Sequence, residues 1–319
     1  MISFIVIGKN EGWRLTKCLT SINTVIKEDG ITDYEIIYVD SKSTDDSVER
    51  ALCFKDVQVY EITGECNAAI ARNIGALEAK GDILFFIDGD MEVLPGFLPS
   101  VMTSNNKLLY PFMSGIFEDY IYDENWNFIE IQKRLKISET LKDRFETTTG
   151  GLFIIESSLW KSVGGMDNRL VRSQDFDLGL RLSNKGIPLL RKPFLLALHH
   201  TLSYFNVVRK NSYATYSVYS AILARKNIMN KKFIHHFIRT DYSAIILFFS
   251  LFFSIIISPF FMFFYSLICL LRSYKIYSKS QLNYFNSFWI LLCRDVIFIL
   301  AFFSIYPKMS KMEYEKFSS

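Results

Sequence analysis

The stretch Ile83-Leu84-Phe85-Phe86-Ile87-Asp88-Gly89-Asp90 decides the fold of this 319-residue chain. Its first five residues are all apolar, and two carboxylates follow them with one glycine between. A short strand that is apolar on both faces is typical of a parallel sheet covered by helices on both sides. Ligands bind to such sheets at the carboxyl ends of the strands, which is where Asp88 and Asp90 stand.

Three more runs of strand-forming residues precede this stretch, and helical patterns separate them. The runs are Ser3–Ile7, Tyr34–Val39 and Val57–Ile62. This alternation predicts an α/β fold with a mostly parallel sheet flanked by helices. Polar residues follow these strands too: Asn10 and Glu11 after the first, and Asp40 after the second.

The following hundred residues are less regular. The aromatic and acidic segment Phe117–Ile131 is compatible with a hairpin, and Gln174–Leu182 has a helical pattern. Pro188–Leu198 is expected to be a final strand that ends before His199 and His200.

Composition excludes several classes of protein. The net charge of +3 does not suggest a nucleic-acid partner. The five cysteines include no CxxC pair, so the pattern of a zinc site or a disulfide framework is missing. Ser3–Ile7 is too short for the apolar region of a signal peptide. We therefore expect the part before the apolar tail to stay in the cytoplasm.

The C-terminal region has the composition of a membrane-associated segment. Ala244–Leu271 contains no charge and exceeds the roughly 20 residues that cross a bilayer as a helix. Pro259 leaves two alternatives: one tilted span, or two half-helices folded back there. Tyr284–Tyr306 contains Arg294 and Asp295, so it is either a span with a paired charge or an in-plane amphipathic helix.

A basic segment precedes the apolar tail. Nine lysines and arginines lie between Arg191 and Arg239, with no acidic residue among them. They are either a solvated face or, next to an apolar segment, a surface for anionic lipid headgroups.

The pair Asp88 and Asp90 can hold a hard divalent cation, and that cation can hold a diphosphate. Alone, an Asp-x-Asp is also common in solvated turns. Further motifs accompany it, in order: Ile5–Glu11, Val39–Asp45, Ala71-Arg72-Asn73, Gly150–Phe153, Val163–Asp167 and Gln174–Leu178. With these motifs, over about residues 2–200, the chain resembles the family 2 glycosyltransferases of the GT-A fold.

The resemblance implies a nucleotide-sugar donor site formed by Asn10, Glu11, Asp40, Arg72, Asp88 and Asp90. In it, Asp40 would bond the base, and Arg72 would hold the nucleotide or its phosphates. Asp88 would contact the ribose or metal-bound water, and Asp90 would bind Mg²⁺ or Mn²⁺ directly. His199 either completes the metal or diphosphate site or is a structural histidine bonded to a carbonyl.

The resemblance also implies an acceptor site that contains Gly150, Gly151 and Gln174. Asp175 would be the general base that takes the proton from the acceptor hydroxyl. Three departures from the family pattern are Gly8, where Pro is frequent, Ser41, where a second Asp is common, and Gln174, where Glu is usual.

These features predict a GT-A catalytic domain at 1–200, divided into a nucleotide-sugar half (1–104) and an acceptor half (105–200). A basic juxtamembrane region (201–241) and a membrane-associated tail (242–319) would follow it. The expected function is inverting transfer of a sugar, of the hexosyltransferase type, from a nucleotide-diphosphate donor to a hydroxyl. The acceptor would be a lipid-linked glycan of surface polysaccharide synthesis, at the cytoplasmic face of the cell membrane.

Two other functions stay open. The acceptor could be a polyprenyl phosphate, whose oxygen is already ionised, so that Asp175 would not be needed. Alternatively, the chain could bind nucleotide sugars without catalysing transfer.

Overall fold

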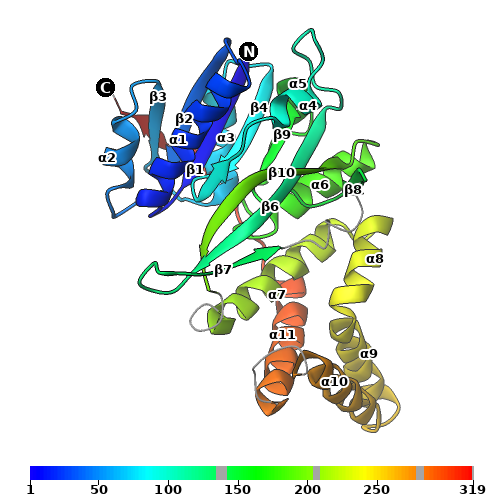
Figure 1. Ribbon diagram of the computed structural model, residues 1–319. Coiled ribbons are helices and arrows are strands. Elements are labelled where there is room, and N and C mark those ends of the chain that lie inside the picture. The colour runs from blue at the N-terminus through cyan, green and yellow to red at the C-terminus, as the bar shows by residue number, and fades with distance from the viewer. Residues whose placement is uncertain (134–141, 204–208, 278–283, 318–319) are drawn as a thin grey trace. The chain divides into compact units, whose positions relative to one another are not determined.

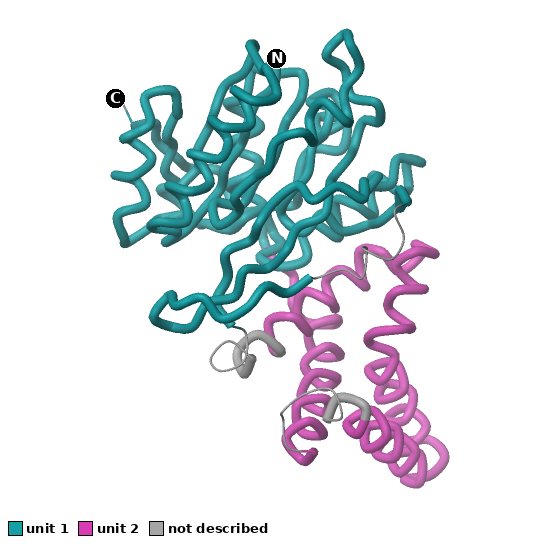
Figure 2. The backbone as a smooth tube through the Cα atoms, viewed as in Figure 1, with its two compact units in different colours: residues 1–203, 308–319 teal, residues 204–307 magenta. Residues whose placement is uncertain are grey.

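The computed structural model describes residues 1–133, 142–203, 209–277 and 284–317. The chain divides into two compact units, shown in Figure 2. The first, here called the catalytic unit after the catalytic domain predicted at residues 1–200, is Met1–Ser203 together with Lys308–Ser319, and the second, here called the helical unit, is Tyr204–Pro307.

The catalytic unit is built on one eleven-stranded sheet (Figure 1). Its first four strands are β1 (Ile2–Gly8), β2 (Tyr34–Asp40), β3 (Val57–Ile62) and β4 (Ile83–Asp88). They pair in parallel in the order β3-β2-β1-β4, which confirms the predicted α/β fold. The sheet as a whole is mixed, because most of the later strands pair antiparallel.

Helices α1 (Trp13–Glu28) and α3 (Ala68–Glu78) cover opposite faces of this parallel part. Phe4 and Val6 of β1 share an apolar cluster with α1, whereas Ile5 and Ile7 share one with α3. Successive strand residues point to opposite faces, so a continuous apolar run was needed here. The two apolar clusters hold β1 and β4 between the helices. They therefore fix the positions at which both strands end at the carboxyl edge of the sheet.

The rest of the catalytic unit contributes shorter elements: α2 (Ser47–Leu52), β5 (Met91–Val93), α4 (Phe97–Val101), β6 (Phe112–Tyr122), β7 (Phe128–Lys133), β8 (Arg144–Glu146), β9 (Phe153–Glu156), α5 (Ser157–Ser162), α6 (Gln174–Asn184) and β10 (Leu189–Leu202). Strands β6 and β7 form the hairpin that the aromatic and acidic segment predicted. The expected end of the final strand was wrong, because β10 continues through His199 and His200 to Leu202. Their side chains are buried partners of neighbouring strands, which the sequence pattern alone does not indicate.

The segment that follows the helical unit returns to the sheet. Strand β11 (Tyr314–Lys316) pairs antiparallel with β3 and covers its outer edge. The carbonyl of Glu313 accepts hydrogen bonds from the amides of Thr63 and Gly64. The Tyr314 hydroxyl donates to Glu78 of α3, 2.6 Å away.

The helical unit consists of α7 (Arg209–Lys226), α8 (Lys231–Thr240), α9 (Tyr242–Ile256), α10 (Phe261–Tyr277) and α11 (Tyr284–Ser304). The uncharged stretch is broken between α9 and α10, at Ser258 and Pro259, as in the second of the two sequence alternatives. Among the described residues, α11 is the one unbroken helix long and apolar enough to cross a membrane, and α8 with α9 passes only as a pair bent by 82°.

The charges inside the apolar helices have partners within the helical unit. Arg294 lies 2.6 Å from Asp241, the residue at the bend between α8 and α9. The hydroxyl of Tyr265 donates to Asp295 at 3.1 Å. Both carboxylates are buried, and buried charges are tolerated when they are paired and hydrogen-bonded. The polar residues that interrupt the apolar pattern therefore join helices to one another.

Removal of residues 313–319 should lower the stability of the catalytic unit. The edge of β3 would lose its partner strand and the Glu313 acceptor, and each lost hydrogen bond contributes about 1 kcal/mol. We expect the free energy of unfolding to fall by about 2–4 kcal/mol, measured by thermal denaturation in detergent. Lys316→Ala is the matched control, since exposed charges contribute little. An unchanged melting temperature of the truncated chain would contradict this role of β11.

Candidate active site

A pocket of about 300 Å³ opens at the carboxyl ends of the parallel strands. The loops after β1, β2 and β3 and the end of β4 line it, with Lys9, Glu11, Ser41, Asn67 and Asp90 among the lining residues. The loop after β3 is held by Asn67, whose side chain caps α3 and also donates to the carbonyl of Asn168. The pocket is therefore where the sequence predicted a ligand site.

The loops after β1 and β2 are bonded to each other on one side of this pocket. The amide of Asn10 donates to the Ser43 hydroxyl at 2.8 Å. The Asn10 side chain accepts from the amide of Thr44 at 2.7 Å. Asn10 has a φ of +57°, a conformation that asparagine adopts more readily than most residues. Asn10 thus ties together the two loops that contribute Lys9, Glu11 and Ser41 to the lining of the pocket.

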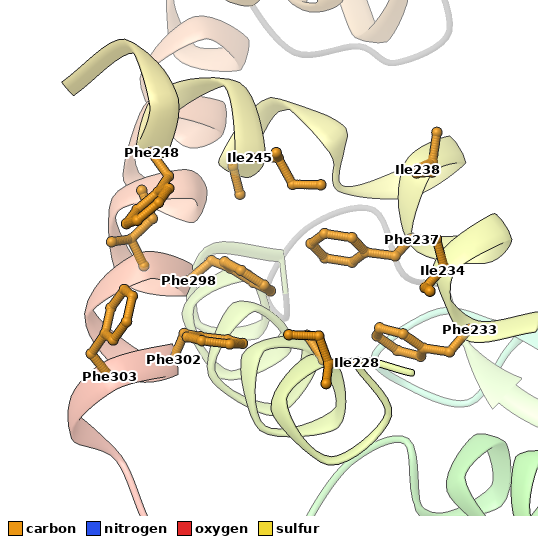
Figure 3. A pocket seen from close by; sticks show the side chains of 13 residues that line it. Ile228, Phe233, Ile234, Phe237, Ile238, Ile245, Phe248, Phe298, Phe302 and Phe303 are labelled. Atoms are coloured by element: carbon orange, nitrogen blue, oxygen red, sulfur yellow. The ribbon is translucent and has the colours of Figure 1, made fainter. Parts of the chain in front are cut away.

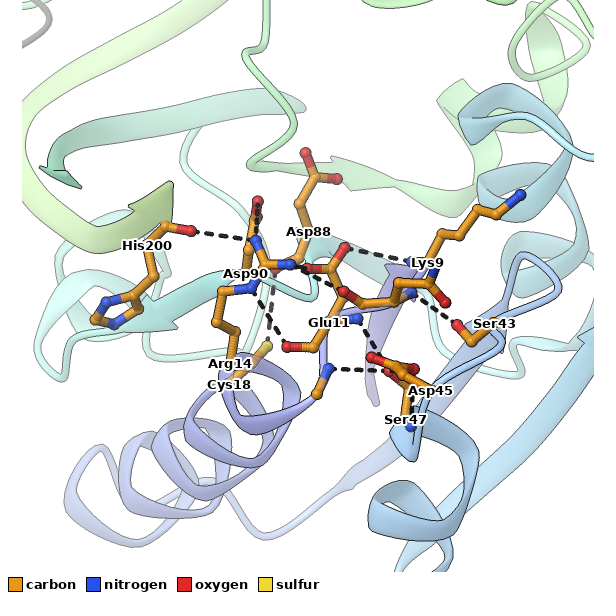
Figure 4. Close-up of polar contacts among 12 residues, drawn as sticks. Lys9, Glu11, Arg14, Cys18, Ser43, Asp45, Ser47, Asp88, Asp90 and His200 are labelled. Carbon is orange, nitrogen blue, oxygen red and sulfur yellow. Dashed lines mark hydrogen bonds and ion pairs between the residues drawn. The ribbon is translucent and has the colours of Figure 1, made fainter. Parts of the chain in front are cut away.

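Three carboxylates meet at the base of the pocket: Glu11, Asp88 and Asp90 (Figure 4). Burial, and then the nearby charge of Asp90, raise the pKa of Glu11 to about 7. Burial likewise raises the pKa of Asp88 to about 6, against the attraction of Arg72. Burial alone would also raise the pKa of Asp90, but its hydrogen bond and charge interaction with His199 outweigh that and lower it. The positive charges near these three carboxylates are therefore too few to balance their negative charge.

Two histidines of β10 face acidic residues. The Nε2 atom of His199 lies 3.2 Å from Asp90, and its Nδ1 atom lies 2.6 Å from the buried Asp119 of β6. His200 lies 3.0 Å from Glu92, and its Nδ1 atom lies 2.9 Å from the Tyr122 hydroxyl. The structure thus brings His199, but not the side chain of its neighbour, into contact with Asp90.

Asp40 and Arg72 are buried in the walls of the site. Asp40 is fully buried and accepts hydrogen bonds from the hydroxyl of Tyr38 and from the amide and hydroxyl of Ser43, each at 2.6 Å. Arg72 is 3% exposed, and its guanidinium lies 2.5 Å from Asp88. In this structure both side chains hold other parts of the site in place, and their contact with a nucleotide stays a prediction.

Two glycines from the second half of the catalytic unit, Gly150 and Gly151, lie beside the site. Gly151 has a φ of +85°, and a Cβ atom there would lie 1.9 Å from Asp88 Oδ2, so no larger residue fits without a shift. The amide of Gly150 donates to Asp175 at 3.4 Å. These contacts bring Asp175 to the same region as Asp88, as the motif order predicted.

Asp175 is half-buried at the first turn of α6, directly after Gln174. A carboxylate is favoured at a helix N-terminus, where the backbone dipole is positive. Asp177, two residues on, is fully buried and pairs with Arg181 at 2.8 Å. That pair fastens α6 to the preceding loop through the carbonyls of Val163 and Gly165, so only Asp175 of the two is available for chemistry.

The sequence reasoning missed Arg14 and Asp119. Arg14 lies 2.7 Å from Glu11 and 3.7 Å from Asp90, and it donates to the carbonyl of His200 (Figure 4). Its guanidinium also lies over the ring of Trp126, 4.6 Å from the ring centroid. A positive charge in the first turn of a helix is unfavourable, which was a signal that it has acidic partners. Asp119 occupies a buried position of the alternating strand β6, and an acid at such a position also indicates a buried partner.

Comparisons with known proteins agree with this geometry. Residues 3–157 match the model of the family described as Glycosyl transferase family 2. Polypeptide N-acetylgalactosaminyltransferase 8 of Drosophila melanogaster is 28% identical over 183 residues, which are 50% of this chain and 31% of the relative. Polypeptide N-acetylgalactosaminyltransferase 6 of Bos taurus is 25% identical over 198 residues, 53% of this chain and 32% of the relative.

The chain thus spans about a third of the length of these curated relatives. Among solved structures, GalNAc-T7 with UDP, GalNAc and Mn²⁺ is similar, with a TM-score of 0.51 and 16% identity over 68% of this chain and 48% of that one. The chain thus has a GT-A fold, and residues 3–157, just under half of its length, match glycosyl transferase family 2.

Proposed function

We propose that this protein is an inverting, metal-dependent glycosyltransferase that moves a sugar from a nucleotide-diphosphate donor to a hydroxyl of a lipid-linked glycan. One observation carries the proposal: Glu11, Asp88 and Asp90 surround a pocket at the carboxyl edge of the sheet, and Asp175 reaches the same region from the other half. The family and the UDP and GalNAc of the GalNAc-T7 structure support the donor class.

The residues at the pocket base fit a divalent cation. Asp90 Oδ1 is buried and, among the described residues, has no hydrogen-bond partner, while Oδ2 faces the imidazole of His199. No three acidic, histidine or cysteine side chains within the described parts of the chain form a complete metal site. We therefore assign Asp90 and His199 as protein ligands, with donor phosphates and water completing the shell. A nitrogen ligand favours Mn²⁺ over Mg²⁺, which prefers oxygen.

When bound, the cation would neutralise the charge that develops on the departing diphosphate. The other parts of the site act by position. Arg72 holds Asp88, which would face the ribose or metal-bound water, and Asp119 orients the imidazole of His199. Asn10 holds the loops after β1 and β2 together beside the pocket, where the nucleotide would bind.

Asp175 is proposed as the general base. It takes the proton of the acceptor hydroxyl while that oxygen forms a bond to the anomeric carbon. The bond from the anomeric carbon to the diphosphate breaks at the same time, and its electron pair leaves with the diphosphate. A single displacement inverts the anomeric configuration. Gly150 packs against Phe117 and Gly151 against Asp88, so this loop lies close beside the site, where it would contact the acceptor.

The helical unit supports a membrane-borne acceptor. It contains one helix of spanning length and further apolar helices, and its sequence has eleven basic and two acidic residues. Positive charge beside apolar surface is typical of attachment to a leaflet with anionic lipids. We place the enzyme at the cytoplasmic face of the cell membrane, in the synthesis of a surface polysaccharide.

Asp175→Asn should reduce the rate of transfer by about 10²- to 10⁴-fold, because the proton of the acceptor hydroxyl loses its base. The measurement is nucleoside diphosphate release with Mn²⁺, a panel of nucleotide sugars and a membrane lipid extract. Nucleotide affinity should not change. Glu49→Gln, an exposed acid in the first turn of α2, is the matched control. Near-normal transfer by Asp175→Asn would instead favour an ionised polyprenyl phosphate as acceptor.

Asp90→Asn and His199→Ala should each abolish tight Mn²⁺ binding, which electron paramagnetic resonance measures without turnover. Asp119→Asn should weaken the affinity by about 10- to 100-fold, as expected when a metal-bound histidine loses its carboxylate partner. Glu92→Gln, the same change at the partner of His200, should leave the affinity intact. Equal losses in all four variants would show a general collapse of the site and contradict the assignment.

Glu11→Gln should stabilise the metal-free protein above neutral pH. The pKa of Glu11 is raised from 4.5 to about 7, so its ionised form costs folding free energy that grows from pH 4.5 upward and is complete above pH 7. The amide removes this cost, by about 1–3 kcal/mol at pH 8. Melting temperatures of both proteins should coincide at pH 4.5 and separate at pH 8. A variant less stable than the wild type at pH 8 would show that the pair with Arg14 dominates instead.

A further inference from the structure

An apolar groove of about 320 Å³ lies within the helical unit (Figure 3). Thirteen side chains line it, from α7, α8, α9, α11 and the turn after α7, and every one is Ala, Ile or Phe. The volume falls within the range of small-molecule sites, about 300–1,000 Å³. Among the lining residues that the structure describes, none has a polar side chain that could fix a water or a polar ligand.

The groove is open, in contrast to the filled core of the catalytic unit. Ile228 is 59% exposed, Ile238 is 55% exposed and Phe303 is 58% exposed. Packed protein interiors leave few voids larger than a water molecule, and an apolar cavity of this size stays dry unless an apolar ligand enters it. The lining is thus complementary to a hydrocarbon.

Helix α8 gives the groove a basic rim. Its Phe233 and Phe237 are buried and face the groove, whereas Lys231, Lys232 and Arg239 are exposed on the same short helix. In the part of the unit that the structure describes, both acids are buried, and no exposed acid is present to oppose these charges. A ligand that matches both features carries a hydrocarbon chain and a negatively charged head.

The volume favours a ligand with one chain. A groove of about 320 Å³ lies at the small end of ligand sites, about 300–1,000 Å³, and accommodates a segment of a single chain. A phospholipid would leave its second chain outside, whereas a polyprenyl phosphate has only one.

We propose that this groove binds the isoprenoid chain of a polyprenyl phosphate or diphosphate, with its phosphate against Lys231 and Lys232. Resting on the proposed function, this lipid is the carrier of the acceptor glycan. The groove then recognises the carrier, whatever glycan the carrier bears, and the catalytic unit selects donor and hydroxyl. Acceptor binding would accordingly divide between two sites with different chemistry.

The test uses the full chain in phosphatidylcholine vesicles with a trace of polyprenyl phosphate that carries a photoreactive diazirine in its chain. No nucleotide sugar is present, so labelling does not depend on transfer. After irradiation, mass spectrometry should locate the label on peptides of α8 and α11. A diazirine-bearing phosphatidylcholine at the same concentration should label these peptides at least about tenfold less.

Three variants distinguish a loss of binding in the groove from a loss of the fold. Ile238→Trp, at an exposed lining position, should reduce labelling at least about tenfold, while Ile255→Trp, at an 86% exposed position outside the groove, should not. Reversing both charges with Lys231→Glu and Lys232→Glu should also reduce it, without changing the lining. Equal labelling of all variants, equal labelling by phosphatidylcholine, or crosslinking of two protein chains through the groove would overturn the proposal.

Transfer assays then distinguish this proposal from the enzymatic one. If both hold, Ile238→Trp should raise the KM for a lipid-linked acceptor and leave kcat nearly unchanged. Specific labelling without any sugar transfer would support the groove and count against the proposed reaction. Transfer to lipid-linked acceptor with an unchanged KM in Ile238→Trp would support the reaction and count against the groove.

Discussion

The ion pair between Arg72 and Asp88 is the contact on which the active site depends. Arg72 is buried, and an unpaired guanidinium there would be strongly destabilising. The pair joins α3 to the end of β4, and Gly151 packs against the other oxygen of Asp88. Gly150 then donates to Asp175. One chain of contacts therefore runs from the nucleotide half to the proposed base, and the geometry of each half constrains the other.

The parallel half of the fold was predictable from the sequence because its signals are local. Each of the four strands is a short run of strand-forming residues, and the observed bounds differ from the predicted ones by about one residue at an end. The later strands were harder to predict from the sequence. Strand β10 contains His199 and His200, and polar residues after an apolar run are typical of a loop. Their polar side chains are buried only because β5 and β6 supply acidic partners that lie 80 residues or more away in sequence.

The candidate site likewise contains some residues that could be predicted from the sequence and others that could not. The order of the motifs along the chain identified Asp88, Asp90 and Asp175 as candidate site residues. In the structure these residues lie in the same region of the catalytic unit. Contacts between distant strands, such as that of Asp119 with His199, left only a weak trace in the sequence. The burial of Asp40 was also not foreseeable, because it results from Tyr38 and Ser43 closing over it. Pro259, which allowed two alternatives, marks a break because proline lacks the amide that a continuous helix needs.

The return of β11 to β3 also orders events during synthesis. The partner residues Ile62 and Tyr314 are about 250 residues apart in the chain. At roughly 5–20 residues per second, the edge of β3 therefore waits on the order of ten to fifty seconds for its partner strand. All helices of the helical unit emerge from the ribosome within that interval. The chain thus completes its sheet only after the helices of the helical unit have been synthesised, so the catalytic unit is fully assembled only near the end of synthesis.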